Sequence, residues 1–393
     1  MPEVEIAWLS PDGAGGGHGP HGAIRVAGAI PGDLVQIGPV GKRDREAALI
    51  SLLRPSPDRQ PAPCTVDARC GGCDLAAWQP DARRAGLAAL VQRAFGLDAP
   101  PPVVPSPRER GYRARVQLAI EGGRAGYRGH RGKELVVPDA CGIARSEVNA
   151  AIDTLQAWLA EGSAEGLTRA ELRSDGAAVA FALQSAGPVP RAVRERLAEL
   201  GDVALDGRAL AGDPVRWLPS PGGRLKASPR SFYQVNLETN TLLAAHVVEQ
   251  VLARSPERVL DAYSGNGNLA LPLARQGIPV TAVELDGQAL ADLRAVSEGL
   301  PVEALAMDAE KVEWRRIAFD VAVLDPPRAG TKGVLSRMLA NRPRAFVYVA
   351  CHPVSGARDL REAAAQGYRI TDVRCFDMFP DTHHVETVIV AER

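Results

Sequence analysis

The chain has 393 residues, of which 46% are hydrophobic and 24% charged, and its formal net charge is −1. This length predicts two or three domains with buried cores, and this composition excludes a disordered or fibrous protein. The near-zero net charge excludes a uniformly basic nucleic-acid coat, so any nucleic-acid contact must come from a local patch. No apolar run is long enough to span a membrane, and the first ten residues lack the basic start of a signal peptide. We therefore expect a cytoplasmic protein.

Residues 1–55 are predicted to form a small β-barrel. Short β-prone runs at 4–8, 22–26, 33–38 and 47–53 alternate there with Gly and Pro turns. The glycine-rich stretch 13–19 has no following Lys-Ser/Thr pair, so it is not a phosphate-binding loop. We expect it to be a flexible loop.

Residues 56–225 are predicted to form a central α+β domain that begins with a proline-rich linker. Its candidate helices lie at 81–96 and 147–160, and its candidate strands at 115–120 and 177–183. Four cysteines belong to this domain: Cys64, Cys70, Cys73 and Cys141. Clustered cysteines in a cytosolic chain of this size suggest metal ligands before disulfides. Four thiolates suit either an iron–sulfur cluster or a structural zinc ion.

Residues 108–133 carry the local excess of positive charge. They hold seven Arg and one Lys against two Glu, with Tyr112 and Tyr127 interleaved. Basic side chains that contact phosphates, together with aromatic rings that stack on bases, favour single-stranded or looped RNA as a partner. A solvated sheet face is the alternative reading of this segment.

Residues 226–393 alternate helical and strand patterns, which predicts an α/β domain with a mostly parallel sheet that ends in an antiparallel hairpin. The predicted strands cover 258–263, 280–284, 302–307, 321–324, 346–350, 370–376 and 385–390.

The first of these strands leads into a glycine turn that suits a cofactor. Gly265 and Gly267 let the backbone turn tightly and approach a ligand. Acidic residues end successive strands at Asp261, Glu284 and Asp308. At such a position Glu284 can accept both hydroxyls of a ribose, and Asp308 could reach an adenine amino group. The turn lacks a third glycine at the dinucleotide spacing, which favours S-adenosylmethionine (SAM) over NAD.

Two later strands supply reactive side chains. Asp325 opens the motif Asp-Pro-Pro-Arg328, in which arginine stands where N-methyltransferases have an aromatic residue. Cys351 ends the following strand, at the edge of a parallel sheet where ligands bind, and Glu386 begins the last one. Arg328 or His352 could help the Cys351 thiol to ionise. Cys375 has no such surroundings, and we expect it to be structural.

These motifs and their order resemble the RNA (uracil-5-)-methyltransferase family, which makes 5-methyluridine in ribosomal and transfer RNA. The resemblance covers nearly the whole chain. The run Ile30-Pro-Gly-Asp-Leu-Val35 resembles part of a TRAM domain, an RNA-binding β-barrel, and Phe232-Tyr-Gln-Val-Asn236 resembles a SAM-contacting motif. The resemblance implies a class I SAM-dependent (Rossmann-like) methyltransferase domain over 226–393, a TRAM-like barrel over 1–55 and an iron–sulfur domain with an RNA-binding surface over 56–225.

The resemblance also implies roles for single residues. It implies SAM contacts for Gln234, Tyr263, Asn268, Glu284 and Asp325, a 4Fe–4S cluster on Cys64, Cys70, Cys73 and Cys141, a nucleophile at Cys351 and a proton acceptor at Glu386. The nucleophile motif reads Ala350-Cys-His-Pro353 here, whereas the family usually has Ser-Cys-Asn/Asp-Pro. Members with both a TRAM domain and a cluster often act on large-subunit RNA, so 23S ribosomal RNA is favoured over transfer RNA.

Methylation at carbon 5 of uracil needs both of these side chains, because this carbon is a poor nucleophile. A thiolate that adds to carbon 6 makes an enolate that can take the methyl group, and a base must then remove the carbon-5 proton. Cys351 and Glu386 meet these two needs.

Other readings remain open from sequence. A SAM-dependent N-methyltransferase of RNA or protein would not need Cys351, and a non-catalytic RNA-binding protein would need neither Cys351 nor Glu386. A radical SAM enzyme is disfavoured, because Cys64 and Cys70 are too far apart for its tight cysteine loop. No obligate protein partner is indicated.

Overall fold

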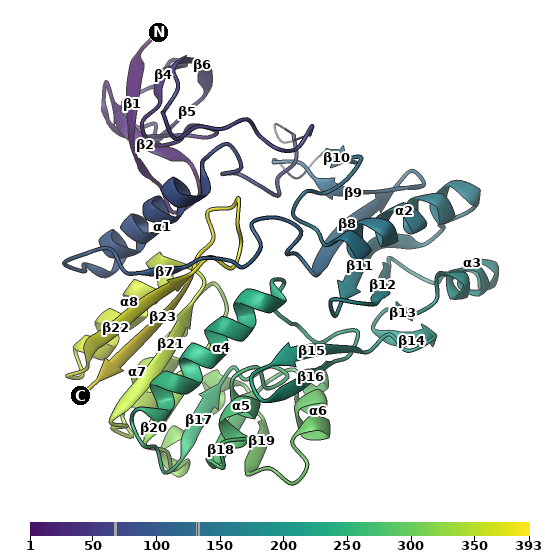
Figure 1. Ribbon diagram of the computed structural model, residues 1–393, viewed down its shortest axis with the longest axis vertical. Coiled ribbons are helices and arrows are strands. Elements are labelled where there is room, and N and C mark those ends of the chain that lie inside the picture. Colours follow the sequence, from purple (N-terminus) through teal and green to yellow (C-terminus); the bar gives the residue numbers. More distant parts are fainter. Residues whose placement is uncertain (67–68, 131, 133) are drawn as a thin grey trace.

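The computed structural model describes residues 1–66, 69–130, 132 and 134–393, and it arranges them around three main sheets (Figure 1). The N-terminal sheet has the order β5-β3-β2-β1-β4-β6 and curves around a small apolar core that includes Ile6, Ile24 and Val35. Its strands are β1 (Glu3–Leu9), β2 (Gly15–Gly19), β3 (Gly22–Val26), β4 (Leu34–Ile37), β5 (Glu46–Ala47) and β6 (Leu49–Arg54). This barrel-like sheet agrees with the prediction for residues 1–55.

The prediction of a flexible loop at residues 13–19 is wrong, because β2 is a strand that pairs with both β1 and β3. Its glycines permit very close packing. A Cβ added at Gly16 would lie 2.0 Å from Nε1 of Trp8, and one at Gly15 would lie 2.6 Å from the carbonyl oxygen of Ala29. Strand propensity failed here because backbone proximity, rather than side-chain preference, selects the residues.

The central sheet has the order β10-β9-β8-β11-β12-β13-β14, with α2 (Ser146–Glu161) packed on it. Its strands are β8 (Arg115–Glu121), β9 (Arg124–Arg128), β10 (Leu135–Val136), β11 (Leu167–Ser174), β12 (Val179–Ser185), β13 (Val203–Leu205) and β14 (Arg208–Ala211). The predicted strands at 115–120 and 177–183 and the helix at 147–160 correspond to β8, β12 and α2. Helix α3 (Arg191–Leu197) and the hairpin of β15 (Arg216–Ser220) and β16 (Gly223–Ala227) complete this region.

The C-terminal sheet has the order β19-β18-β17-β20-β21-β23-β22-β7. Its first five strands in this order are parallel neighbours, whereas β23 runs antiparallel to both β21 and β22, as the sequence predicted. The strands are β17 (Val259–Ala262), β18 (Val280–Glu284), β19 (Val302–Ala306), β20 (Val321–Leu324), β21 (Ala345–Ala350), β22 (Arg369–Phe376), β23 (Glu386–Glu392) and β7 (Val103–Val104).

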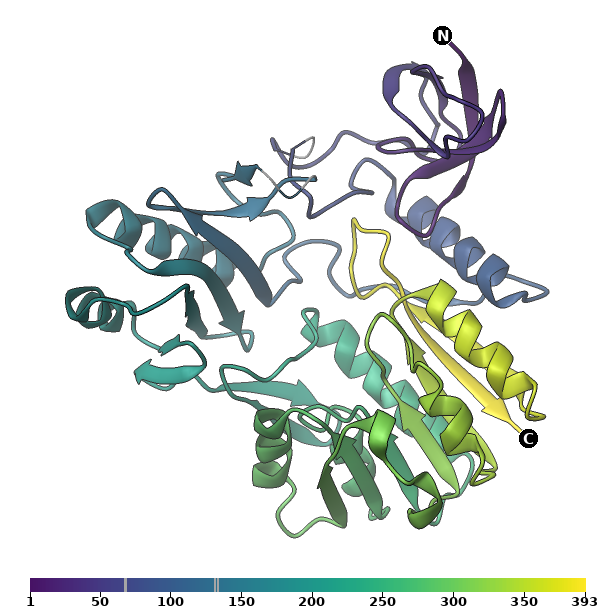
Figure 2. The ribbon, with the colours of Figure 1, turned by 180° about the vertical axis from the view of Figure 1, so that it is seen from behind.

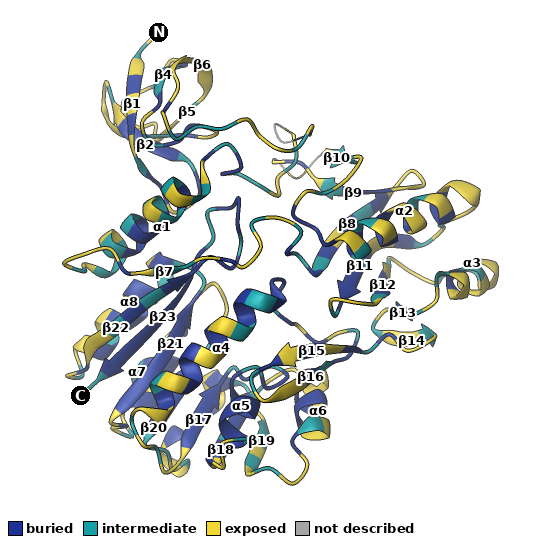
Figure 3. Cartoon of the chain, viewed as in Figure 1, coloured by how far each residue is buried: buried dark blue, intermediate teal, exposed yellow. Residues whose placement is uncertain are grey.

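Helices cover both faces of this sheet, so its central strands are buried throughout (Figure 3). Alternate strand residues pack to opposite sides: Val323 and Val347 meet one apolar core, and Leu324 and Phe346 meet the other. The first face carries α4 (Leu237–Leu252), α5 (Ala270–Ala274) and α6 (Gly287–Val296), and the second carries α7 (Val334–Leu339), α8 (Pro353–Ala364) and α1 (Pro80–Phe95).

Helix α1 and strand β7 come early in the chain but lie on the C-terminal sheet. Helix α1 packs along α8, as the view from behind shows (Figure 2), and its Leu87 and Val91 enter the core beneath that sheet. Strand β7 pairs in parallel with β22 at the sheet edge. Among the helices in the described ranges, none combines the length and the apolar character that crossing a membrane requires.

Candidate cofactor and reaction site

A cavity of about 560 Å³ opens at the carboxyl ends of β17, β18, β20 and β21. This is the edge at which parallel sheets bind ligands. Seven of the sequence-predicted residues line it: Gln234, Tyr263, Asn268, Glu284, Asp325, Cys351 and Glu386. The fold therefore brings together side chains from positions 234 to 386 in one place.

Asp308 is missing from the described residues that line this cavity. Its carboxylate accepts a hydrogen bond of 2.9 Å from the backbone N–H of Glu310 and so caps the short helix Ala309–Lys311. The carboxylate thus has a local structural partner, whatever else it contacts when a ligand is bound.

Backbone N–H groups orient Glu284 at the end of β18. One carboxylate oxygen accepts from the N–H of Gly265 at 2.9 Å, and the other accepts from the N–H of Asp286 at 2.7 Å. Tyr263, just before this turn, adopts a φ of 65°, which is unfavourable for a residue with a Cβ. The turn after β17 is thus held in a strained conformation against a fixed carboxylate.

The side-chain amide of Asn268 is oriented by that of Asn240, with which it forms two hydrogen bonds of 2.8 and 3.0 Å. Asn240 lies on α4 and also lines the cavity. The sequence analysis missed it. The signal available was its place one helical turn after Asn236, the residue that caps α4.

The segment that presents Gln234 is fixed from two sides. The Asp292 carboxylate on α6 accepts from the N–H and hydroxyl of Ser228 at 2.7 and 2.6 Å and from the hydroxyl of Ser231. Arg173, on β11 of the central sheet, donates to the carbonyl oxygens of the same two serines at 3.1 and 2.6 Å. Both main domains therefore position this cofactor-side segment.

The side of the cavity that contains Asp325, Cys351 and Glu386 is rich in carboxyl groups and largely buried. Burial raises the pKa of Asp325 to about 7. Burial, with Asp325 next to it, raises the pKa of Glu386 well above its usual range. Burial is the main cause that raises the pKa of the Cys351 thiol to about 12, and the nearby Glu386 and Asp325 add to it. Arg328 acts in the opposite direction and lowers this pKa. A cation bound here would favour the charged form of all three groups.

His352 caps the helix that follows the reactive cysteine. Its Nδ1 accepts a hydrogen bond from the backbone N–H of Ser355 at 3.3 Å, at the start of α8. Asparagine and aspartate cap helices in the same way, so His352 fulfils the capping part of the more usual Asn/Asp. Burial lowers the pKa of His352, which keeps the ring neutral. Cys351 precedes this cap, near the positive end of the α8 dipole, which favours a thiolate.

The four clustered cysteines line a second cavity of about 360 Å³, together with Arg110, Arg113, Arg115 and Arg128. Burial, and then the nearby Asp381, Cys141 and Cys70, raise the pKa of Cys73 above its usual range. Within the described residues no group of three or more His, Cys, Asp or Glu is arranged to hold a metal ion. A 4Fe–4S cluster is held by four cysteine thiolates, and four cysteines line this cavity.

The basic segment 108–133 borders the cysteine cavity. Arg115 stacks over the exposed ring of Phe232 at 4.6 Å. Tyr112 is fully buried, so the predicted stacking of this residue on a base is wrong. Arg131 and Lys133 lie outside the described residues.

Three comparisons with known proteins point to the same family of RNA methyltransferases. Residues 302–393 match the profile of the tRNA (Uracil-5-)-methyltransferase family. The 23S rRNA (uracil(1939)-C(5))-methyltransferase RlmD of Pseudomonas putida is 31% identical, over 93% of this chain and 88% of that protein. RlmD of Pectobacterium atrosepticum is 30% identical, over 98% of this chain and 92% of that protein. The crystal structure of Pyrococcus abyssi tRNA (uracil-54, C5)-methyltransferase in complex with S-adenosyl-L-homocysteine covers 100% of both chains, with 25% identity and a TM-score of 0.79.

Proposed function

The chain belongs to the RNA (uracil-5-)-methyltransferase family, and we propose on that premise that it transfers the methyl group of SAM to carbon 5 of a uridine in RNA. A site in 23S ribosomal RNA is the first candidate, because the bacterial relatives named for that RNA match the chain over nearly their full length. Transfer RNA is the second, after the name of the Pyrococcus neighbour. The observation that carries the proposal is that Cys351 and Glu386 share one cavity with the glycine turn.

In this proposal SAM occupies the side of the cavity nearest β17 and β18. The oriented carboxylate of Glu284 accepts the ribose hydroxyls, and Gln234, Tyr263 and the Asn268 amide complete the cofactor contacts. Asp325 lies toward the reacting centre, where its negative charge attracts the cationic sulfonium.

Cys351 begins the reaction by adding its thiolate to carbon 6 of uracil. The cofactor cation, Arg328 and the N-terminal end of α8 all favour ionisation of this thiol. Carbon 5 then takes the methyl group that bound SAM supplies. Glu386 removes the carbon-5 proton, the C–H electrons form the C5=C6 double bond, and the bond between carbon 6 and sulfur breaks to return the thiolate.

The runner-up, an N-methyltransferase, has less support. It needs an aromatic residue after Asp-Pro-Pro to stack on the target, but Arg328 stands there. It also gives no role to Cys351, which lies beside Glu386 and Asp325 in the same cavity.

We also propose that Cys64, Cys70, Cys73 and Cys141 hold a 4Fe–4S cluster with a structural role. The surrounding arginines would balance the negative charge of such a cluster. In this assignment residues 1–55 form a TRAM-like RNA-binding barrel, 56–225 the iron–sulfur domain and 226–393 the methyltransferase domain.

The test is to incubate the purified protein with labelled SAM and with total RNA from a strain that lacks the gene, then to digest the RNA and identify the methylated nucleoside. Wild type is expected to make 5-methyluridine, and Cys351→Ala to make none. Cys375→Ala, a matched change at a buried cysteine outside the cavity, should retain activity. A different methylated nucleoside, or an active Cys351→Ala variant, would replace this proposal with the N-methyltransferase.

A further inference from the structure

The loop of residues 377–385, between β22 and β23, separates the two cavities. Its Asp381 lines the cysteine cavity, whereas its Phe379 lines the reaction cavity. Glu386 follows the loop directly as the first residue of β23. The position of this loop therefore bears on the proposed base.

The position of the Glu386 carboxyl group is set by the pairing of the Glu386 backbone, because hydrogen bonds do not anchor its Oε2 in the described part of the chain. Its side chain is buried, and within the described part of the chain its Oε2 has no hydrogen-bond partner. Its backbone pairs with Phe376 across the hairpin. Because Glu386 is the terminal residue of the pairing, the loop before it decides how firmly it is held.

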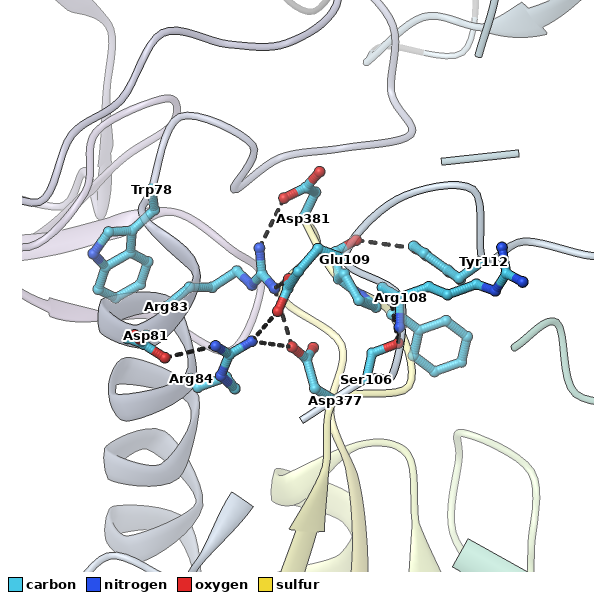
Figure 4. Close-up of polar contacts among 12 residues, drawn as sticks. Trp78, Asp81, Arg83, Arg84, Ser106, Arg108, Glu109, Tyr112, Asp377 and Asp381 are labelled. Atoms are coloured by element: carbon cyan, nitrogen blue, oxygen red, sulfur yellow. Dashed lines mark hydrogen bonds and ion pairs between the residues drawn. The ribbon is translucent and has the colours of Figure 1, made fainter. Parts of the chain in front are cut away.

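Arg83 on α1 holds the loop at two points. Its guanidinium, which is fully buried, donates to the carboxylates of Asp381 at 2.7 Å and Asp377 at 3.0 Å (Figure 4). These partners lie 298 and 294 positions later in the chain. The third partner, Glu109, accepts at 2.9 Å.

A buried ion cluster of this kind is a costly way to join a helix to a loop. Removing charges from water costs free energy that an apolar contact would not, so such a cluster adds little net stability, and loss of one partner leaves buried charges uncompensated. Here the geometry that the cluster defines is that of the 377–385 loop.

Other contacts hold the rest of the loop. The hydroxyl of buried Tyr112 donates to the carbonyl oxygen of Pro380 at 3.0 Å. The carboxylate of Asp74, next to the cluster cysteine Cys73, accepts from the N–H of His383 at 3.0 Å and also pairs with Nδ1 of the His383 ring. Arg83 differs from these contacts because it forms ion pairs with two residues of the loop, Asp377 and Asp381.

We propose that Arg83 is a positioning residue for the removal of the carbon-5 proton, the step assigned to Glu386. This inference rests on the proposed function. Within the described part of the chain, Arg83 donates its side-chain hydrogen bonds to the 377–385 loop and to Glu109. These partners lie outside the strand that carries Cys351 and outside the segments that carry the proposed cofactor residues, so the loss of Arg83 should spare addition and methyl transfer. It should slow the step in which Glu386 takes the proton, the C5=C6 bond forms and the thiolate leaves.

The measurement is the fraction of enzyme that remains bound to RNA as a covalent adduct on a denaturing gel, taken with the rate of 5-methyluridine release. With SAM and RNA, Glu386→Gln should accumulate the adduct and Cys351→Ala should give none. Arg83→Gln should lower kcat about 10-fold, which is a part of the roughly 10²–10⁴-fold that a general base contributes. It should leave the KM for SAM unchanged and raise the adduct fraction toward that of Glu386→Gln.

Arg93→Gln is the matched control, because Arg93 lies on the same helix but donates to the carbonyl oxygen of Leu9 in the N-terminal sheet. It should leave the adduct fraction at the wild-type level. An equal rise in Arg93→Gln would mean general loosening of α1 and would overturn the inference. So would an inactive Arg83→Gln without adduct when Glu386→Gln accumulates it.

If Arg83→Gln does not fold, Tyr112→Phe tests the same loop by removing one hydrogen bond. About a twofold rise in adduct supports the positioning role, and an unchanged fraction contradicts it. The proposed function fails separately, through a Glu386→Gln variant that forms no adduct.

Discussion

The two cavities share a wall in the 377–385 loop but have opposite electrostatic character. The reaction cavity is lined by Glu284, Asp325 and Glu386, with burial that raises the pKa of the last two. The cysteine cavity is lined by thiols and a set of four arginines: Arg110, Arg113, Arg115 and Arg128. The first suits a cationic sulfonium and the second an anionic cluster or RNA phosphates. The contrast shows that an overall charge of −1 conceals one site rich in carboxyl groups and one rich in arginines.

The largest effect is expected at the cysteine cavity. Cys73→Ser should abolish iron incorporation and remove most of the soluble yield, because binding of a structural metal group contributes directly to folding. The checks are iron content and visible absorbance after anaerobic purification. Cys375→Ala should behave as wild type. Normal yield with lost activity in Cys73→Ser would instead assign the cluster a role in the reaction.

At the acidic cavity, Glu284→Gln should weaken SAM binding by about 10–100-fold, because charge-assisted hydrogen bonds contribute about 1.5–3 kcal/mol. Isothermal titration calorimetry measures this affinity. Asp308→Asn is the control, since Asp308 caps a local helix outside the cavity lining. A loss of equal size in Asp308→Asn would assign it to the adenine contact that the sequence suggested.

The acidic cavity should also make SAM binding depend on pH. With a pKa of about 7, Asp325 is largely protonated below that pH in the ligand-free protein. An exposed aspartate has a pKa near 3.9. Because the folded protein keeps Asp325 protonated up to about pH 7, this residue lowers the free energy of unfolding as pH rises from about 4 to about 7. A bound cation stabilises the ionised form and offsets that cost. SAM affinity should therefore rise from pH 6 to pH 8, by up to about 10-fold for one proton.

Calorimetry in two buffers of different ionisation enthalpy should detect the proton that SAM binding releases near pH 7. Asp325→Asn should bind SAM more weakly, with a flatter pH profile. A wild-type affinity that does not change with pH would contradict the assignment of the sulfonium to this group.

The smallest effect is expected at His352. Two substitutions distinguish a role in capping α8 from a role in acid–base chemistry. His352→Ala should cost about 1 kcal/mol of stability through loss of the α8 cap. His352→Asn should keep both the cap and activity within about threefold. Thermal unfolding and single-turnover rates measure the two quantities. A large rate loss in the asparagine variant would mean that the ring takes part in ionising Cys351.

Local sequence was sufficient for part of the reaction cavity, whereas Gln234, Tyr263 and Asn268 were predicted from the family resemblance. The glycine turn at Gly265, the acidic residue Glu284 at a strand end and Cys351 at another could be placed together because parallel strands share a ligand-binding edge. The antiparallel hairpin of β22 and β23 at the end of the sheet was also predicted from the hydrophobic runs. These inferences need only periodicity within a strand and one rule of topology.

Tertiary structure alone decided the rest. Position 16 in strand β2 requires glycine because the Trp8 ring leaves no room for a Cβ. Tyr112 is buried although its neighbours are basic. The Arg83 cluster joins residues 298 positions apart, and α1 lies on the C-terminal sheet. The sequence determined which groups end each strand. Contacts between distant segments leave no periodic signal, so only the packed chain decided which groups hold the reaction site in place.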